Sequence, residues 1–157
     1  MKESQRTGAR KPGTPGAFSR WVKQRSNARI NRRIRRGRGR ALGMDVLILH
    51  TVGRRSRRPR ETPVAWFAEG EHVRLIVAMG SGSQNPDWYA NLMAYPEEAS
   101  IELAGGVAIP VRPERLEGAD RERAWLRIIT EQPIFAKHQS RSGREYPVVR
   151  LSPRWRR

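Results

Sequence analysis

The sequence contains no cysteine, and this absence excludes several kinds of chemistry at once. Disulfide bonds, thiolate catalysis, iron–sulfur clusters and cysteine-based zinc sites all need that side chain. Histidine is scarce as well, and His50, His72 and His138 show neither the His-x-His nor the His-x-x-x-His spacing of common metal sites. We therefore expect no metal site.

Long apolar runs are also absent. The longest, Val46 to Leu49 and Leu75 to Met79, are far shorter than the roughly 18 residues that a membrane-spanning helix needs. The basic N-terminus is followed by neither the apolar core nor the small-residue cleavage site of a secretory signal. A chain of 157 residues predicts one domain with its own core, in a reducing, cytoplasmic setting.

Negative charge is sparse and unevenly placed. The chain has 32 Lys or Arg against 15 Asp or Glu, which gives a formal charge of +17. Residues 1–60 hold 19 of the basic residues with only Glu3 and Asp45, whereas residues 61–157 hold 13 of each sign. Strong positive charge favours nucleic acid or an anionic membrane as a partner. The distribution confines that tendency to the N-terminal part.

The composition divides the chain into three segments. Residues 1–16 are rich in Gly, Pro, Thr, Lys and Arg, which predicts a disordered basic tail. Residues 17–40 predict a basic amphipathic helix, because apolar residues recur at helical spacing among arginines. These apolar residues are Phe18, Trp21, Val22, Ile30 and Ile34. Residues 42–153 predict the globular domain.

The globular segment has the pattern of an α+β fold. Apolar, β-rich runs predict strands over 44–52, 62–68, 72–79, 100–103, 107–116 and 146–151. Helices are predicted over 85–95, with Asn85 as N-cap and Pro86 at the first helical position, and over 119–130, with a short further piece ending at Ser140. About six short strands with inserted helices predict a small antiparallel β-barrel, since closure removes exposed strand edges.

Two loops have the composition of anion-binding sites. Residues 54–60 contain five arginines between two predicted strands, and guanidinium groups bind phosphate or carboxylate in a bidentate manner. A solvated hairpin loop is the alternative, but Gly53, Ser56 and Pro59 favour a shaped turn. Residues 79–85 form a Gly/Ser-rich loop before a helix N-terminus, where backbone N–H groups can receive a phosphate, although a plain connection has the same composition.

Among the histidines, His138 is the candidate for chemistry. His50 is expected to lie in a core strand with its hydrogen bonds satisfied, and His72 belongs to a hairpin turn. His138 follows Phe135 in a short late helix that can line a pocket, and imidazole is a suitable proton donor near neutral pH. A surface histidine without a role is the alternative.

Four motifs in order resemble the deazaflavin-dependent nitroreductase family, over roughly residues 42–153. They are Leu49-His50-Thr51-Val52-Gly53-Arg54-Arg55-Ser56, Pro59-Arg60-Glu61-Thr62-Pro63, Asn85-Pro86-Asp87-Trp88-Tyr89-Ala90-Asn91-Leu92 and Arg144-Glu145-Tyr146-Pro147-Val148-Val149. The resemblance implies a split β-barrel of the flavin-reductase or FMN-binding type that uses coenzyme F(420), a deazaflavin. It also implies hydride transfer to a small planar acceptor such as a quinone or nitro-aromatic compound.

The resemblance also implies roles for individual residues. Arg54, Arg55 and Arg60, with Ser56, would bind the cofactor phosphate. The ring would lie against the remaining cofactor residues, which are Pro63, Ala65, Met79, Gly80, Ser81, Asn85 and Trp88. The acceptor pocket would be lined by Trp66, Phe135 and His138, and the product proton would come from His138, Tyr89 or water.

Two departures from the family pattern are visible. Arg57 stands where the family usually has glycine, so a turn with positive φ there would cost about 1–2 kcal/mol. Aromatic residues that the family often places in the late helix are replaced by Gln132, Phe135 and His138.

Two other functions are compatible with these patterns. The same fold can bind FMN or haem, because fold alone does not select a ligand. The basic arm can also bind nucleic acid without catalysis. For the arm at residues 17–40 we favour an anionic membrane surface on the inner face of the cell membrane, since an apolar stripe flanked by cations is typical of interfacial helices.

Overall fold

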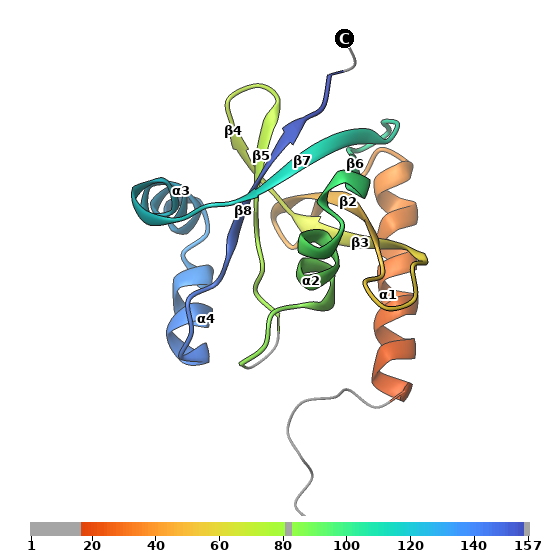
Figure 1. Ribbon diagram of the computed structural model, residues 1–157, viewed down its shortest axis with the longest axis horizontal. Coiled ribbons are helices and arrows are strands. Elements are labelled where there is room, and N and C mark those ends of the chain that lie inside the picture. The colour runs from red at the N-terminus through yellow and green to blue at the C-terminus, as the bar shows by residue number, and fades with distance from the viewer. Residues whose placement is uncertain (1–16, 81–82, 156–157) are drawn as a thin grey trace, which may run out of the picture.

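The computed structural model describes residues 17–80 and 83–155, with side chains from residue 25 onward (Figure 1). Its helices are α1 (Ala17–Arg35), α2 (Asp87–Ala94), the single 3-10 turn η1 (Pro96–Glu98), α3 (Gly118–Glu131) and α4 (Ile134–Ser142). Its strands are β1 (Arg40–Ala41), β2 (Met44–Val52), β3 (Pro59–Ala65), β4 (Phe67–Glu69), β5 (Val73–Val77), β6 (Ser100–Glu102), β7 (Ile109–Arg115) and β8 (Val148–Pro153). The predicted disordered tail, residues 1–16, lies outside the described residues.

The strands form one curled antiparallel sheet in the order β1-β2-β6-β7-β8-β5-β4, with β3 paired to β2 (Figure 1). The outer strands β3 and β4 follow one another in the chain and are separated only by Trp66. The Trp66 backbone N–H donates to the Asp45 carbonyl at 3.0 Å, which ties this corner to β2. The α+β half-barrel with inserted helices confirms the predicted fold class.

Strand β2 has the bounds expected from its apolar run, and its two faces serve two cores. Leu47 and Leu49 point into the sheet's concave interior, whereas Val46 and Ile48 contact α1 on the other face. This alternation follows from the two-residue period of a strand. Burial on both faces explains why β2 reads as a continuous apolar run.

The three cores together position the helices. The interior core, which includes Ile76, Val111, Val149 and Leu151, also takes Tyr89 and Leu92 of α2. A second core lies beneath α3 and α4, and its members are Phe67, Leu75, Val77, Leu116, Ala124, Trp125, Ile128, Phe135, Tyr146 and Val148. Helix α2 therefore closes the interior, and α3 and α4 cover the opposite face of β5 and β8.

The eight strands exceed the predicted six for two reasons. The two-residue β1 has no pattern of its own and exists because Arg40 and Ala41 pair with Asp45 and Met44. The expected strand over 62–68 is divided at Trp66, so that its first part pairs with β2 and its second with β5. A change of partner within one apolar run leaves no local sequence signal.

Helix α1 packs on the sheet, and this corrects the expected membrane-facing stripe. Ile34 is fully buried against Val46 and Ile48, and Ile30 packs on the same cluster. These two isoleucines therefore face the protein. The side chains of Phe18, Trp21 and Val22 lie outside the described residues. Among the described residues, no helix is both long and apolar enough to cross a membrane.

An ion network fastens the end of α1 to the sheet. Arg35 Nη2 lies 2.7 Å from Glu61 Oε1 on β3 and 2.8 Å from Glu102 Oε2 on β6. His50 Nε2 on β2 lies 2.6 Å from the same Glu102 oxygen, which confirms that His50 is satisfied in a strand. The Arg35 guanidinium holds the pKa of the Glu102 carboxyl below its ordinary value. Helix α1 is thus tied to three strands.

If α1 belongs to the folded unit, Ile34→Ala should lower the free energy of unfolding by about 2–5 kcal/mol, the usual cost of a fully buried Ile-to-Ala change. Urea unfolding followed by tryptophan fluorescence measures this. Arg33→Ala, on the exposed side of the same helix, is the matched control and should change stability by less than about 0.5 kcal/mol. Equal stability of both variants would show that α1 does not contribute to the core.

Candidate functional site

The basic loop, residues 53–60, comprises the turn between β2 and β3 and the first two residues of β3, and it is shaped as predicted. The Gly53 N–H donates to the Arg58 carbonyl, and the Arg57 N–H donates to the Gly53 carbonyl, both at 2.9 Å. Ser56 Oγ accepts from the Arg58 N–H at 3.2 Å. A Cβ on Gly53 would lie 2.5 Å from Ser56 Oγ, so a larger residue there would displace the Ser56 side chain from its bond to the Arg58 N–H.

Arg54 attaches the basic loop to α2. Its backbone N–H and its Nη1 both donate to Asn91 Oδ1, at 3.0 and 2.9 Å, and its Nη2 lies 3.4 Å from Asp87 Oδ1. Asn91 is buried, so these bonds lie in a protected environment. Arg54, expected to bind phosphate, is therefore engaged within the protein and fixes the loop against the helix.

Arg57, which stands where the family usually has glycine, adopts the left-handed backbone conformation. Its φ is 60°, a region that glycine enters freely and other residues enter at a cost of about 1–2 kcal/mol. The Arg57 guanidinium lies 4.2 Å from the centre of the Tyr95 ring. This cation–π contact offsets part of the strain, since exposed examples contribute about 0.5–1 kcal/mol.

The other arginines of the basic loop are available to a ligand. Arg55, Arg58 and Arg60 are exposed, and none forms an ion pair with a residue that the structure describes. Three like charges on a tight loop repel one another, and bound phosphate or carboxylate groups would relieve that repulsion. The loop therefore fits a polyanionic ligand.

The segment between β5 and α2 leads into the helix to which Arg54 attaches the basic loop. Gly80 has φ +62°, and a Cβ there would lie 2.3 Å from the Gln84 carbonyl oxygen, so the segment folds back tightly on itself. Ser81 lies outside the described residues. The expected N-cap role of Asn85 is wrong, because its Oδ1 accepts instead from Arg144 Nη1 at 2.6 Å. Pro86 is the N-cap residue, with ψ 152°, and it makes no side-chain cap.

The expected ring-facing residues on β3 and α2 are placed as follows. Pro63 and Ala65 pair with Ile48 and Val46, and Ala65 packs on the α1 side of the sheet. Trp88 is half-buried against the interior core, with its ring 6.3 Å from that of Tyr89. Tyr89 is only 8% exposed, and its ring packs in the interior core.

The residues expected to line one acceptor pocket lie apart. Phe135 is buried in the second core, edge-on to Phe67 with ring centres 5.8 Å apart. His138 is exposed on α4. Trp66 lines a cavity of about 240 Å³ whose other walls include Asp45 and Leu103. The structure does not bring these three residues into one cavity.

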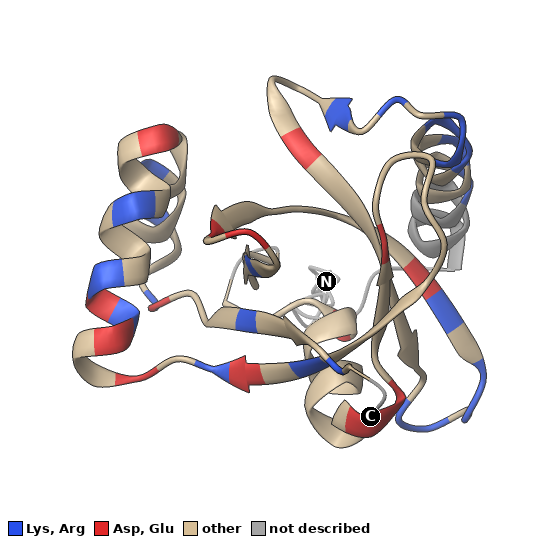
Figure 2. Ribbon diagram, turned by 90° about the horizontal axis from the view of Figure 1, so that it is seen from above, with Lys and Arg blue, Asp and Glu red and all other residues tan. Residues whose placement is uncertain are grey.

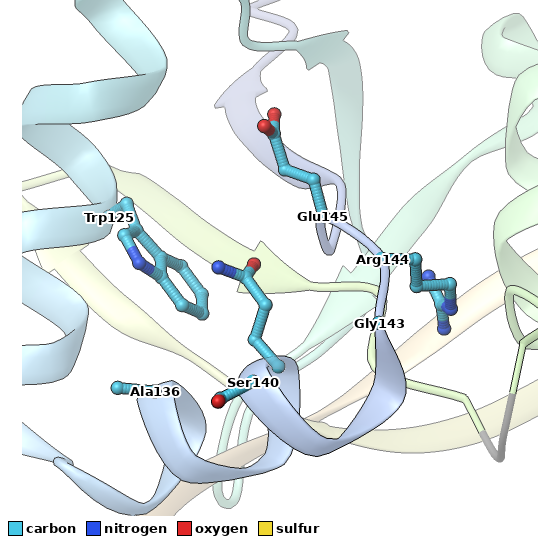
Figure 3. Close-up of a pocket in the computed structure, with 7 residues that line it drawn as sticks. Trp125, Ala136, Ser140, Gly143, Arg144 and Glu145 are labelled. Carbon is cyan, nitrogen blue, oxygen red and sulfur yellow. The ribbon is translucent and has the colours of Figure 1, made fainter.

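A larger cavity, of about 380 Å³, lies between α3 and α4 (Figure 3). Its walls are Trp125, Ala136, Gln139, Ser140, Gly143, Arg144 and Glu145. In Figure 3 the Arg144 side chain is directed away from Trp125 and Ala136. Neither of these two cavities is lined by a residue of the basic loop, so cavity size alone does not locate the anion-binding surface.

Within the described part of the chain, His50, Glu61 and Glu102 are the group whose ligand atoms come close enough for a metal ion, within 4.8 Å of one another. Arg35 donates to both carboxylates from the side of α1. A cation at this place would have to displace that guanidinium. The group therefore acts as the ion network that holds α1, and the expectation of no metal site stays a prediction.

Three functional contacts were missed by the sequence reasoning. Asn91 holds Arg54, Tyr95 stacks on Arg57, and Arg144 holds the segment before α2. Asp87 and Asn91 are four residues apart and share one face of α2, which is a signal for a polar docking site. Arg144 has no such local signal.

Comparison with known proteins places these observations in a family. A profile described as F(420)H(2)-dependent quinone reductase matches residues 21–153. An F(420)H(2)-dependent quinone reductase of Mycobacterium tuberculosis is 30% identical over 151 residues, which cover 87% of this chain and 99% of the relative.

Solved structures show the same fold. An F(420)H(2)-dependent reductase has a TM-score of 0.59 at 26% identity, over 68% of this chain and 93% of that one. A protein solved as a domain-swapped dimer has a TM-score of 0.60 at 23% identity, over 87% of this chain and 100% of that one. The first of these supports the split-barrel reductase fold.

The strain at Arg57 can be measured with a pair of variants. Arg57→Ala should be less stable than Arg57→Gly by about 1 kcal/mol in urea unfolding, because both variants lack the Tyr95 contact and only alanine carries the Cβ that strains the left-handed φ. Arg58, whose φ is not positive, supplies the control pair. There the glycine variant should be no more stable than the alanine variant. The same order at both positions would contradict the strain.

Proposed function

This chain belongs to the family of F(420)H(2)-dependent quinone reductases, and on that premise we propose that it is an oxidoreductase that reduces a quinone with reduced coenzyme F(420). The observation that carries the proposal beyond the family match is the basic loop. Its exposed Arg55, Arg58 and Arg60 form no ion pair with the described residues, so they can bind an anionic ligand. The FMN, haem and nucleic-acid alternatives have no comparable support.

Anion binding divides among the arginines in this proposal. Arg55 and Arg60, with Arg58 beside them, bind the phosphate and carboxylate groups of the cofactor, and Ser56 keeps the turn in shape. Arg54 does not bind the cofactor directly in this proposal. Its bonds to Asn91 and Asp87 set the distance between the loop and α2.

The cofactor ring would then lie along the free edge of β3. Among the described strands, β3 pairs with β2 alone, so the backbone groups around Pro63 and Ala65 on its other edge remain available to a ligand. In this proposal Met79, Gly80 and Asn85, which precede α2, would contact the other side of the ring. Trp88 of α2 packs against the interior core and would support the helix there.

The cofactor supplies the redox chemistry, and the protein orients the cofactor and the acceptor. Reduced deazaflavin supplies a hydride, and one proton completes reduction of a quinone to the quinol. The chain holds the acceptor against the ring and excludes competing reactions. For the proton, His138, Tyr89 and water are the candidates, and His138 is the more exposed of the two side chains. Trp66 lines a cavity and would form an apolar wall, whereas Phe135 is buried in the second core and would support α4 from beneath.

Fluorescence titration of the purified protein with oxidised and reduced cofactor tests this function. Removing Arg55 and Arg60 together (R55A, R60A) should weaken binding by about tenfold or more, since each hydrogen bond with a charged group contributes about 1.5–3 kcal/mol. Arg112→Ala, an exposed arginine of β7, is the control and should bind normally.

The same preparation distinguishes the alternatives. The absorption spectrum as purified would reveal FMN or haem, and a panel of quinone, nitro and enone acceptors should show quinone reduced fastest. A protein that binds neither redox form of F(420) below about millimolar would contradict the proposal.

We also propose that α1 lies on an anionic membrane surface through its outer face, on the cytoplasmic side of the membrane where a lipid-soluble quinone is found. The residues of that face are Arg25, Arg29, Arg32, Arg33 and Arg36, all exposed. Their spacing puts them on one side of the helix, opposite Ile30 and Ile34. Figure 2 shows the same concentration of basic residues on α1 and at the β2–β3 loop.

The structure changes the physical basis of this surface from the apolar stripe to its cations. Adjacent like charges on a helix destabilise it, so an anionic partner would stabilise this arrangement. Each basic side chain near an anionic leaflet contributes about 1 kcal/mol, which screening by salt reduces.

Co-sedimentation with vesicles tests the surface. A variant with four outer-face arginines changed to glutamine (R29Q, R32Q, R33Q, R36Q) should lose roughly a hundredfold or more in affinity for vesicles containing phosphatidylglycerol. A control with the same change of charge elsewhere (R112Q, R115Q, R123Q, R141Q) should retain binding. Equal binding by both variants, or tighter binding to RNA than to vesicles at physiological salt, would contradict the proposal.

A further inference from the structure

Arg144 bonds to both ends of the segment between β5 and α2. It lies in the turn after α4, more than 50 residues further along the chain. Its Nη2 donates to the Met79 carbonyl and, at 2.9 Å, to the Gln84 carbonyl. Its Nη1 donates to Asn85 Oδ1 at 2.6 Å. One guanidinium therefore holds the start and the end of this segment together.

The two ends of the segment that Arg144 bonds also lie against each other. At Gly80, a Cβ would meet Gln84 O at 2.3 Å and Pro86 N at 3.0 Å, so the two ends are in direct backbone contact. The Met79 and Gln84 carbonyl oxygens both accept from the same guanidinium nitrogen, which links the two ends. The planar, fork-shaped guanidinium can serve both ends at once, which a single ammonium group does less well.

The arginine is itself held in place. Its guanidinium lies 4.8 Å from the centre of the Tyr146 ring, and Tyr146 is buried in the second core. The preceding Gly143 ends α4 in the left-handed conformation, with φ 69°. A buried ring and a fixed helix end thus orient Arg144 toward the segment. In Figure 3 its side chain points away from Trp125 and Ala136.

From the segment the contacts continue to the basic loop. Pro86 leads directly into α2, and the first two turns of α2 carry Asp87 and Asn91, which bind Arg54. Arg144 therefore holds the chain just before α2, and Arg54 contacts the first two turns of the helix itself.

We propose that Arg144 is a positioning residue for the cofactor site: it fixes residues 79–80 and 84–86, and through α2 the basic loop, in the arrangement that binds reduced and oxidised deazaflavin. This inference rests on the proposed function. Arg144 acts through the segment and does not itself take part in the chemistry.

Three variants test the role. Arg144→Gln should weaken binding of both redox forms of F(420) by about tenfold, because it removes charge-assisted bonds at both ends of the segment. Arg144→Lys should fall between this variant and the wild type, since one ammonium group bridges the two ends poorly. In Arg144→Ala, added guanidinium ion should restore binding in part.

The matched control is Arg127→Gln. Arg127 also donates to a backbone carbonyl, that of Ala68 at 2.7 Å, but it does so from α3 to β4, in a part of the molecule remote from α2 (Figure 1). This variant should bind the cofactor within about twofold of wild type. Steady-state kinetics of Arg144→Gln should show a raised KM for the reduced cofactor, with kcat changed by less than about threefold.

Amide hydrogen exchange without cofactor gives a readout that is independent of the proposed function. Arg144→Gln should accelerate exchange at residues 84–86 and in the first turn of α2, and Arg127→Gln should not. If the wild type binds no F(420), the proposed function fails, and this exchange pattern still decides whether Arg144 holds the segment.

Several results would overturn the inference. They are unchanged cofactor affinity in a folded Arg144→Gln variant, an equal loss in Arg127→Gln, or no rescue of Arg144→Ala by guanidinium. If Arg144→Gln and Arg144→Lys both fail to fold, as judged by circular dichroism, Arg144 is a general stability residue and the positioning role is wrong.

Discussion

Burial of β2 on both faces is the constraint on which the rest of this structure depends. Leu47 and Leu49 anchor the interior core, and Val46 and Ile48 anchor α1 on the other face. The same strand pairs with β1, β3 and β6. Its last residues lead into the basic loop, so the arginines there extend from the most firmly held element of the sheet. A loop placed in this way presents its charges with little loss of conformational entropy on binding.

The arginines of this protein have different physical roles although they form one positive region. Arg35 and Arg54 are paired with acidic or amide groups and fix α1 and α2. Arg57 stacks on an aromatic ring, and Arg144 bridges backbone carbonyls. Arg55 and Arg60, which form no ion pair with the residues that the structure describes, are the ones that we propose bind a ligand. Net charge alone does not distinguish these roles, because each depends on what the fold places opposite the guanidinium.

Sequence reasoning predicted the elements whose signal is local. The bounds of β2 and the positive φ at Arg57 follow from an apolar run and the expected glycine, and α2 lies within the predicted range 85–95, although it begins at Asp87 rather than at Pro86. The orientation of α1 was not predicted, because an apolar stripe has the same pattern whether it faces lipid or a sheet. Asn85 was taken for a cap because its partner, Arg144, is 59 residues away. The acceptor pocket stays a prediction, and only tertiary packing decides that Phe135 is buried and His138 is exposed.

The place of β8 in the sheet has a consequence for how the chain folds. This last strand lies between β7 and β5, and it pairs Leu151 with both Pro113 and Arg74. The sheet therefore cannot be completed until the C-terminal residues are present, and the contacts that complete it join distant parts of the chain. Such long-range pairing slows folding. Strands β5 and β7 lack their shared neighbour until β8 has paired with both of them, so the two halves of the sheet become one only through this strand.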